Sequence, residues 1–293
     1  MFWWVVKAIL GPILTVVWRP RNEGKKNVPR TGPAIIASNH LSFADHFFGP
    51  LPLRRPIVFL GKREYFTGKG IKGLASRVFF SGVGVIPIDR TGGGASEEAL
   101  RTGLRVLGEG RLLGIYPEGT RAPDGRLYRG KTGVARLALE ARAPVIPMAM
   151  INTFELMPSG QTRPRLNVRP GVRFGTPLDF SRYYGKADDR EVLRIVTDEV
   201  MQAIRGLSGQ EYVDRYAADV KADLKRESTD EAGSRRLANV HIDDLDDVYG
   251  LDEDDDADRR PDTGRDDGTA PGTSQARDDE AGQDEGKATG REG

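Results

Sequence analysis

The sequence predicts an α/β fold with a mainly parallel sheet flanked by helices, because short apolar runs alternate with stretches of helical spacing from Pro33 to about Phe180. Continuous apolar runs of this length are typical of strands that are buried on both faces. The runs are Ala34–Ala37, Ile57–Leu60, Val83–Ile88, Leu112–Tyr116 and Val145–Ile151. Of the 293 residues 38% are hydrophobic, which is enough for a buried core.

The segments between and after these runs predict helices. Ser96 can cap the first of them, and a second fits Val134–Ala141. A third begins at Asp188, and helical spacing continues to about Lys225. The residues expected on its buried face are Val192, Ile195, Val196 and Val200. Apolar alternation over Leu166–Phe174 predicts an additional strand at an edge of the sheet.

The first eighteen residues are apolar and aromatic, with Lys7 as the one charged side chain. A helix needs about 20 apolar residues to cross a membrane, so this stretch, which Gly11–Pro12 interrupts, is short for a span. Its three tryptophans favour the headgroup boundary. We therefore predict that residues 1–22 form a membrane-interface segment, and that the protein is peripheral or monotopic on the cytoplasmic face of the cell membrane. A membrane span, a signal peptide and a buried helix are the alternatives.

Charge divides the chain into a basic body and an acidic tail. Residues 227–293 carry 22 acidic and 8 basic side chains, a net charge of −14, whereas residues 1–226 carry a net charge of +15. The tail is poor in apolar residues and is predicted to be disordered, which leaves residues 23–226 as the folded domain. Its Asp-rich run, residues 243–258, lacks the spacing of an EF-hand calcium loop. The basic body indicates an anionic partner, which can be phospholipid headgroups, nucleic acid or a phosphorylated substrate.

The supply of reactive side chains is small. The chain has no cysteine, which excludes disulfides, thiolate nucleophiles and cysteine-based zinc sites. Its three histidines, His40, His46 and His241, show no metal-ligand spacing, so neither a metal nor a cofactor is expected. This scarcity narrows the search for a general base.

The sharpest local motif is NHLSFAD at residues 39–45, which follows the predicted strand Ala34–Ala37. Loops at the carboxyl ends of parallel strands are where α/β proteins place their sites. A histidine that acts as a base needs a second group to orient it and to stabilise its protonated form, and Asp45 is the nearest candidate. Residues five apart in a helix lie about 140° apart around its axis, so the backbone must turn between His40 and Asp45. A helix cap beside a hydrogen-bonded histidine is the alternative.

Three further blocks follow in order along the chain, at residues 84–90 (GVIPIDR), 116–121 (YPEGTR) and 145–148 (VIPM). Together with the asparagine-histidine-x4-aspartate block, they resemble the glycerolipid acyltransferase family, and in particular the bacterial 1-acylglycerol-3-phosphate acyltransferases. The resemblance covers roughly residues 25–205, and its specific parts are the first and third blocks. Tyr116 stands where the family commonly has phenylalanine.

The resemblance implies an acyl transfer in which His40 is the base and Asp45 its partner. The donor would be acyl-CoA or acyl carrier protein. The acceptor would be the sn-2 hydroxyl of 1-acylglycerol-3-phosphate, or another lysophospholipid, with phosphatidic acid as a product of phospholipid biosynthesis. Basic side chains suit the dianionic headgroup of such an acceptor, and no nucleic-acid partner is expected. The residues expected to bind substrate are Arg90, Glu118, Gly119, Thr120, Arg121 and Lys131.

Three other interpretations compete with this one. Residues 125–132 (GRLYRGKT) match the P-loop pattern, but a P-loop directly follows a buried strand, and the preceding residues 120–124 (TRAPD) predict none. A non-catalytic lipid-binding protein would share the basic body and the apolar N-terminus without needing the His40 and Asp45 pair. A hydrolase or thioesterase would use the same histidine with water as the acceptor.

Overall fold

A sheet of seven strands organises the part of the chain that the computed structural model describes, which is residues 2–62, 64–67, 70, 73, 84–88, 95–158, 161 and 163–231. The order of the strands is β1-β8-β7-β2-β5-β3-β4. The strands are β1 (Arg21–Glu23), β2 (Ala34–Ser38), β3 (Ile57–Lys62), β4 (Val85–Ile88), β5 (Leu112–Ile115), β7 (Val145–Ile151) and β8 (Gly171–Phe174). Two more short strands, β6 (Leu127–Tyr128) and β9 (Tyr212–Val213), pair with each other.

Neighbouring strands of the large sheet run parallel, except β7 and β8, which are antiparallel. The mainly parallel sheet predicted from the apolar runs is therefore confirmed. Every residue of β2 and β5 is buried, as expected for strands that are covered on both faces. The predicted edge strand corresponds to β8, but β8 is shorter, and β1 pairs along its outer side. All three residues of β1 are polar and exposed, so its sequence carries no apolar strand pattern.

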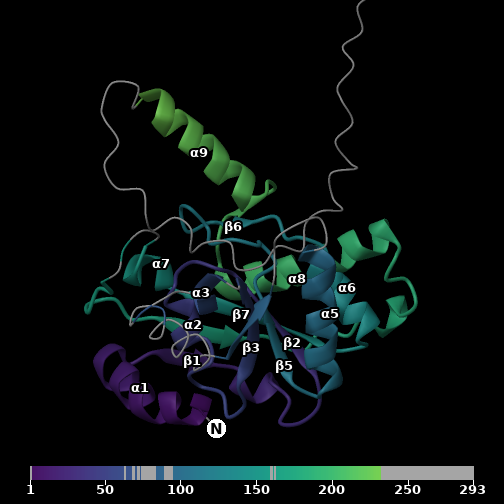
Figure 1. Ribbon diagram of the computed structural model, residues 1–293, viewed down its shortest axis with the longest axis horizontal. Helices are drawn as coiled ribbons and strands as arrows, with labels where there is room; N and C mark the ends of the chain where they lie inside the picture. The colour runs from purple at the N-terminus through teal and green to yellow at the C-terminus, as the bar shows by residue number, and fades with distance from the viewer. Residues whose placement is uncertain are drawn as a thin grey trace, which may run out of the picture. The chain divides into compact units, whose positions relative to one another are not determined.

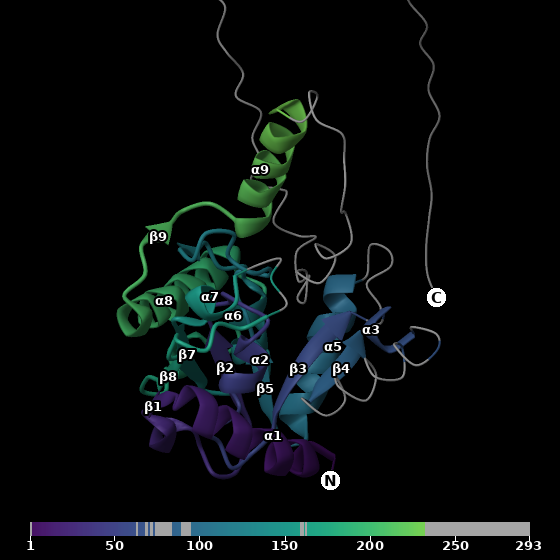
Figure 2. The same cartoon turned by 90° about the vertical axis from the view of Figure 1, so that its left-hand side faces the viewer.

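Helices cover both faces of the sheet (Figure 1). They are α1 (Phe2–Trp18), α2 (Asp45–Phe48), α3 (Glu64–Thr67), α5 (Ala95–Gly108), α6 (Gly133–Glu140), α7 (Thr153–Leu156), α8 (Arg190–Ser208), α9 (Ala217–Glu231) and the short 3-10 helices η1 (Lys25–Asn27) and η2 (Ser181–Tyr183). Leu207 of α8 and Pro147 of β7 both lie beside Gly175, whereas Met148 lies beside Gly49 at the end of α2. Successive residues of a strand point to opposite faces, so α8 and α2 cover opposite faces. Helix α5 lies beside β3 and β4 (Figure 2).

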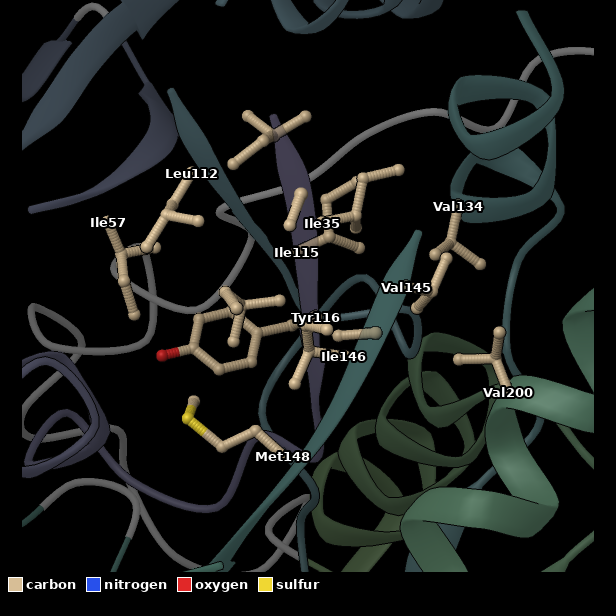
Figure 3. Packing of buried hydrophobic residues seen from close by; sticks show 14 of the residues in the cluster. Ile35, Ile57, Leu112, Ile115, Tyr116, Val134, Val145, Ile146, Met148 and Val200 are labelled. Atoms are coloured by element: carbon tan, nitrogen blue, oxygen red, sulfur yellow. The ribbon is translucent and has the colours of Figure 1, made fainter. Parts of the chain in front are cut away.

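The hydrophobic core fills both sides of the sheet. Val134, Val145 and Val200 lie on the side of α6 and α8, and Tyr116 and Met148 lie on the other (Figure 3). All five side chains are at most 1% exposed. Burial of apolar surface in two layers is the main term that stabilises a central parallel sheet.

The helices depart from the prediction in three details. Helix α5 begins at Ala95, one residue before the predicted cap Ser96. Ile195 is 49% exposed, because Leu193 and other residues complete the buried face of α8 in its place. Helix α8 ends at Ser208, where Gly209 has a φ of +73° and stops the helix. The helical spacing predicted as far as Lys225 is therefore interrupted by β9, and α9 is a separate helix.

Helix α1 lies against the domain along one side. Lys7 donates a hydrogen bond to the carbonyl of Leu53, and the indole of Trp18 donates to the carbonyl of Arg165 at 3.0 Å. The outward side chains are apolar and between 44% and 72% exposed; they are Trp4, Val5, Ile9, Ile13, Val16 and Val17. No helix in the described ranges combines the length and the apolar character that crossing a membrane requires.

Both predicted boundaries of the folded domain fall inside structural elements. Strand β1 joins the sheet and crosses the boundary predicted after residue 22, and α9 crosses the one predicted after residue 226. Residues 232–293 lie outside the described part of the chain, so the disordered acidic tail stays a prediction.

Candidate active site

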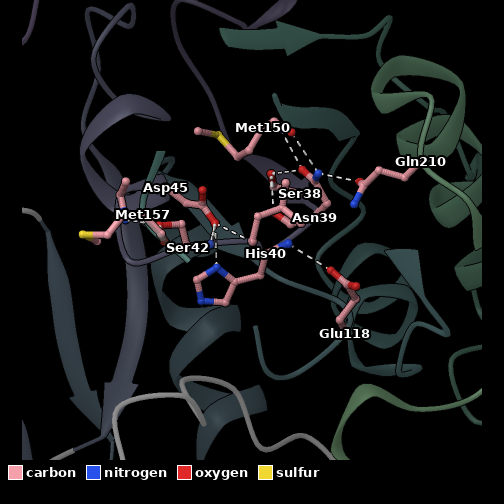
Figure 4. A network of polar contacts seen from close by, with 11 residues as sticks. Ser38, Asn39, His40, Ser42, Asp45, Glu118, Met150, Met157 and Gln210 are labelled. Atoms are coloured by element: carbon pink, nitrogen blue, oxygen red, sulfur yellow. Dashed lines mark hydrogen bonds and ion pairs between the residues drawn. The ribbon is translucent and has the colours of Figure 1, made fainter. Parts of the chain in front are cut away.

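The loops that follow β2 and β5 meet at one edge of the sheet. The two strands are parallel neighbours, with Ala37 opposite Ile115, so their carboxyl ends lie side by side. The loop after β2 holds His40, and the loop after β5 holds Glu118 (Figure 4). This is the edge at which α/β folds generally place a site.

His40 and Asp45 form a buried pair, with 2.8 Å between Nδ1 and Oδ2. The backbone turns between them, as predicted, because residues 39–44 are not helical and α2 begins at Asp45. The same Oδ2 accepts hydrogen bonds from the backbone amides of Leu41 at 2.7 Å and Ser42 at 2.9 Å. Three donors therefore fix the carboxylate against the imidazole.

Burial sets the protonation of this pair. It lowers the pKa of His40 well below its usual range, and the positive charges of Arg121 and Lys221 lower it further. Burial also raises the pKa of Asp45 to about 6, against the opposing effect of the nearby Thr153 hydroxyl and of hydrogen bonds from two backbone amides. At neutral pH the carboxylate is ionised and the imidazole is neutral, with its Nδ1 proton directed at Asp45. The lone pair on Nε2 is then left to accept a proton.

Glu118 holds the backbone of His40. Its Oε2 accepts from the amide of His40 at 2.9 Å, and its Oε1 accepts from the amide of Tyr128 at 2.9 Å. On the other side of the histidine, the amide of Ala122 donates to the carbonyl of His40 at 2.8 Å. Burial raises the pKa of Glu118 to about 8. Glu118 is fully buried and both its oxygens face backbone amides, so its contacts position His40. The substrate-binding role expected from the sequence stays a prediction.

Gly119 shapes the turn that places these groups. Its amide donates to the carbonyl of Tyr116 at 3.0 Å, which closes a turn with Pro117 in second position. Its φ is +77°, and a Cβ at this position would lie 2.9 Å from Cε of Lys131. The half-buried Lys131 is anchored beside it, since its amide donates to the carbonyl of Pro117 at 2.7 Å. The positive φ therefore favours a glycine here, whereas the flexible end of the lysine side chain could move aside.

Thr120 and Arg121 bring polar and basic groups next to the histidine. Both side chains are buried, at 1% and 6% exposure. The hydroxyl of Thr120 accepts a hydrogen bond from Nζ of Lys221 at 2.9 Å. Lys221 lies on α9, about a hundred residues further along the chain and in no motif, so the sequence offered no signal for it. Arg90, also expected here, lies outside the described residues.

Aromatic rings enclose the imidazole. The ring of Tyr116 stacks on His40, with 3.8 Å between centroids and 9° between planes. His46 lies edge-on to His40 at 5.4 Å, and burial lowers its pKa to about 3. Its Nδ1 has no hydrogen-bond partner among the residues that the structure describes. His46 is therefore packed directly against His40.

Asn39 ties the motif to the neighbouring strand β7. Its amide group donates to the carbonyl of Met150 at 3.0 Å, and its Oδ1 accepts from the amide of Met150 at 2.7 Å. It also donates to Oε1 of Gln210 at 2.7 Å, and Gln210 donates in turn to the carbonyl of Gly125 at 2.6 Å. Asn39 therefore holds the loop after β2 against β7. Gln210, like Lys221, is a residue that the sequence did not indicate.

An apolar pocket lies between α1 and α2. Leu10 and Leu14 of α1 line it together with Phe47 and His46 of α2. His46, which lines the pocket, also lies edge-on to His40.

Neither a P-loop nor a metal site is formed by the described residues. The P-loop pattern at residues 125–132 contains β6, and its amides are used by other parts of the fold. The amide of Leu127 donates to the carbonyl of Glu211, and that of Arg129 donates to the carbonyl of Arg215. They do not converge on a phosphate. No group of three or more His, Cys, Asp or Glu side chains in the described ranges is placed to hold a metal ion.

The family model described as Acyltransferase matches residues 19–151 of this chain. A chloroplastic 1-acyl-sn-glycerol-3-phosphate acyltransferase of Arabidopsis thaliana is 33% identical over 139 residues, which is 47% of this chain and 37% of that protein. A 1-acyl-sn-glycerol-3-phosphate acyltransferase of Bacillus subtilis is 32% identical over 129 residues, which is 43% of this chain and 59% of that protein. The chain thus spans between about a third and three fifths of the length of these two relatives.

A solved structure shares the fold. It is the 1-acyl-sn-glycerophosphate acyltransferase of Thermotoga maritima, with a TM-score of 0.51 and 22% sequence identity, and the match covers 75% of this chain and 80% of that one. The family model and the two relatives confirm the resemblance to the glycerolipid acyltransferases for the part of the chain that carries His40 and Asp45.

Proposed function

We propose that this chain, whose residues 19–151 belong to the Acyltransferase family, is a 1-acylglycerol-3-phosphate O-acyltransferase. It moves a fatty acyl group from acyl-CoA or acyl carrier protein to the sn-2 hydroxyl of 1-acylglycerol-3-phosphate and produces phosphatidic acid for phospholipid biosynthesis. The observation that carries the proposal is the buried His40 and Asp45 pair, 2.8 Å apart, at the edge of the sheet to which Arg121 brings positive charge.

The pair provides the proton transfers that the reaction needs. Nε2 of His40 takes the proton of the acceptor hydroxyl, and the oxygen attacks the thioester carbonyl. The imidazolium then returns a proton to the departing thiolate, so no covalent enzyme intermediate is required. Asp45 keeps Nδ1 protonated and stabilises the transient positive charge.

The acceptor phosphate is held by the basic groups around the base. A phosphate monoester is a dianion near neutral pH, and guanidinium and ammonium groups bind it through charge-assisted hydrogen bonds. Arg121 and Lys131 of the loop after β5 supply such groups, with Arg90 as a further candidate. Gly119 and Thr120 contribute through the conformation and the polarity of this loop.

Helix α1 provides the contact with the membrane. Its outward face exposes Trp4, Ile9, Ile13 and Val16, and apolar side chains with tryptophan suit the headgroup boundary. The enzyme would accordingly work as a peripheral or monotopic protein on the cytoplasmic face of the cell membrane.

A transfer assay tests the function. Purified protein is given labelled acyl-CoA or acyl carrier protein with a panel of lysolipids, and we expect 1-acylglycerol-3-phosphate to become diacylated. His40→Ala should lower turnover by about 100-fold or more, as loss of a general base does, while vesicle binding stays unchanged. His241→Ala, which changes the same residue type outside any motif, is the control. Turnover by His40→Ala at a tenth of the wild-type rate would contradict the mechanism and favour a lipid-binding role.

A further inference from the structure

Residues 211–221, which we call the strap, join the end of α8 to the first turns of α9. Its strand β9 pairs with β6, and two more backbone hydrogen bonds extend this ladder. The amide of Leu127 donates to the carbonyl of Glu211 at 2.9 Å, and the amide of Arg129 donates to that of Arg215 at 3.0 Å. The strap lies outside residues 19–151, the part that matches the family model. The strap thus joins the C-terminal part of the described domain to the loop after β5.

The first turn of α9 packs on the neighbours of the catalytic residues. A small apolar cluster separate from the main core consists of Leu41, Ala122, Tyr128 and Ala217. Leu41 directly follows His40, and Ala122 directly follows Arg121. Ala217 at the start of α9 has no exposed surface. The helix is thus anchored on the two loops that build the site.

Lys221 follows Ala217 by one helical turn and reaches the site from that anchor. Its Nζ donates a hydrogen bond to the hydroxyl of Thr120 at 2.9 Å, and Thr120 is 1% exposed. The charges of Arg121 and Lys221 both lower the pKa of His40. Two cations from distant parts of the chain therefore lie close enough to act on the charge of one buried imidazole.

The chemistry of the two substrates indicates which phosphate such cations would meet. In 1-acylglycerol-3-phosphate, the hydroxyl that reacts and the phosphate are borne by adjacent carbons. A cation close enough to act on His40 is then also within reach of this phosphate. The phosphates of CoA are separated from the reacting thioester by the whole pantetheine arm. An anion beside His40 and Thr120 would accordingly belong to the acceptor.

We propose that Lys221 is a phosphate-binding residue of the acceptor site, held in position by Thr120 and carried to the site by the strap. The inference rests on the proposed function. The ligand is the phosphate monoester of the lysophospholipid, and the site would join Arg121 from the loop after β5 with Lys221 from α9. The C-terminal part of the domain would thereby contribute to acceptor selection, while the family-matched part supplies the base.

Lys221→Gln tests the proposal, because it removes the charge and keeps most of the side-chain length. We expect the KM for 1-acylglycerol-3-phosphate to rise about 10-fold, the lower end of the range for loss of a charge-assisted contact, since Lys221 is only half-buried. The KM for acyl-CoA should stay within about twofold. Inhibition by glycerol 3-phosphate, which reports phosphate binding without turnover, should weaken by the same factor. Lys221→Arg should restore most of the affinity.

Lys225→Gln is the matched control, since Lys225 is exposed one turn further along α9 and the charge change is identical. It should leave both KM values unchanged. A Lys221→Gln enzyme with a normal acceptor KM would overturn the inference, and so would one with a raised KM for acyl-CoA alone. If the thermal transition of Lys221→Gln falls, Thr120→Val provides the second test, because it removes the partner hydroxyl and leaves the charge. Wild-type protein that acylates no phosphate-bearing acceptor would instead contradict the proposed function.

Discussion

At the scale of single residues, the pair at the centre of the site predicts how activity depends on pH. Activity requires neutral His40, whose pKa is depressed, so activity is lost only as the pH falls through a value below the usual one near 6.5. Protonation of Asp45, with a pKa of about 6, removes the acceptor of the Nδ1 proton over the same range. The two steps belong to the pair as a whole. We expect kcat/KM to be level above pH 7 and its acid limb to have a midpoint at or below about pH 6.

The charge around the pair makes this profile testable by mutation. The groups that face His40 are Asp45, His46, Glu118, Arg121 and Lys221. Replacing Arg121 by Gln removes a positive charge that disfavours the imidazolium, so the acid limb should move to higher pH. The measurement is kcat/KM from pH 5 to 8. An acid limb at the same pH in Arg121→Gln and wild type would show that the charge of Arg121 does not act on His40.

Replacement of Glu118 should lower stability and turnover while leaving the binding of the acceptor nearly unchanged. In Glu118→Gln an amide nitrogen replaces one of the two carboxylate oxygens and cannot accept a hydrogen bond. The backbone amide of either His40 or Tyr128 then loses its acceptor and faces another donor in a buried site. The free energy of unfolding should fall by about 1–3 kcal/mol, and turnover should fall because His40 is displaced. The acceptor KM should change little. Thermal unfolding and steady-state kinetics measure both.

Glu109→Gln is the matched control for this change. Glu109 is 43% exposed and pairs with Arg111 on the surface, where an ion pair contributes little to stability. It should unfold and react as wild type does. A raised acceptor KM with normal stability in Glu118→Gln would instead support the substrate-binding role predicted from the sequence.

At the scale of elements, α1 predicts how the protein finds the membrane. Deletion of residues 1–20 is a poor test, because Trp18 contacts Phe48 and the loss of α1 would uncover apolar surface of the core. Substitution of Ile9, Ile13 and Val16 by Ser changes the outward face alone. Each half-exposed side chain contributes about 1 kcal/mol to burial in lipid, so the triple variant should bind neutral vesicles about 100-fold more weakly.

The control for α1 changes exposed apolar side chains on other helices. Ile195 of α8 is 49% exposed and Leu224 of α9 is 48% exposed. Their replacement by Ser should leave flotation with neutral vesicles unchanged. If it weakens flotation as much as the α1 variant does, the membrane contact involves another face of the domain.

At the scale of the whole molecule, the predicted acidic tail should be dispensable for chemistry. A chain that ends after Glu231 keeps all of α9 and removes a segment too poor in apolar residues to pack. Its thermal transition and specific activity should match those of the full chain. Binding to anionic vesicles at low salt should increase, because the basic body is then no longer offset by the tail. Loss of most activity in the folded, shortened chain would assign the tail to the site.

The sequence predicted the centre of the fold and the chemistry at its edge, but not the parts that depend on distant contacts. The strands β2, β5 and β7 were predictable because both faces are buried, so their sequences are continuously apolar. Asp45 was predicted as the partner of His40 because it is the nearest candidate in the NHLSFAD motif, and the family resemblance implied the same pair. Strand β9 was missed because two residues form it only by pairing with β6. Lys221 and Gln210 were missed because tertiary contacts alone bring them to the site.

Lys7 gives the proposed membrane contact an unusual dependence on solution conditions. It is the one charged residue of α1. Its ammonium group donates a hydrogen bond to the carbonyl of Leu53 and lies over the ring of Trp3, so it does not point outward. The outward face therefore carries no charge for salt to screen. Attachment through this face should survive high concentrations of sodium chloride, gain strength in sulfate, and weaken on cooling, as apolar burial does. On neutral bilayers, cold buffer without sulfate is then the condition under which this face detaches most readily.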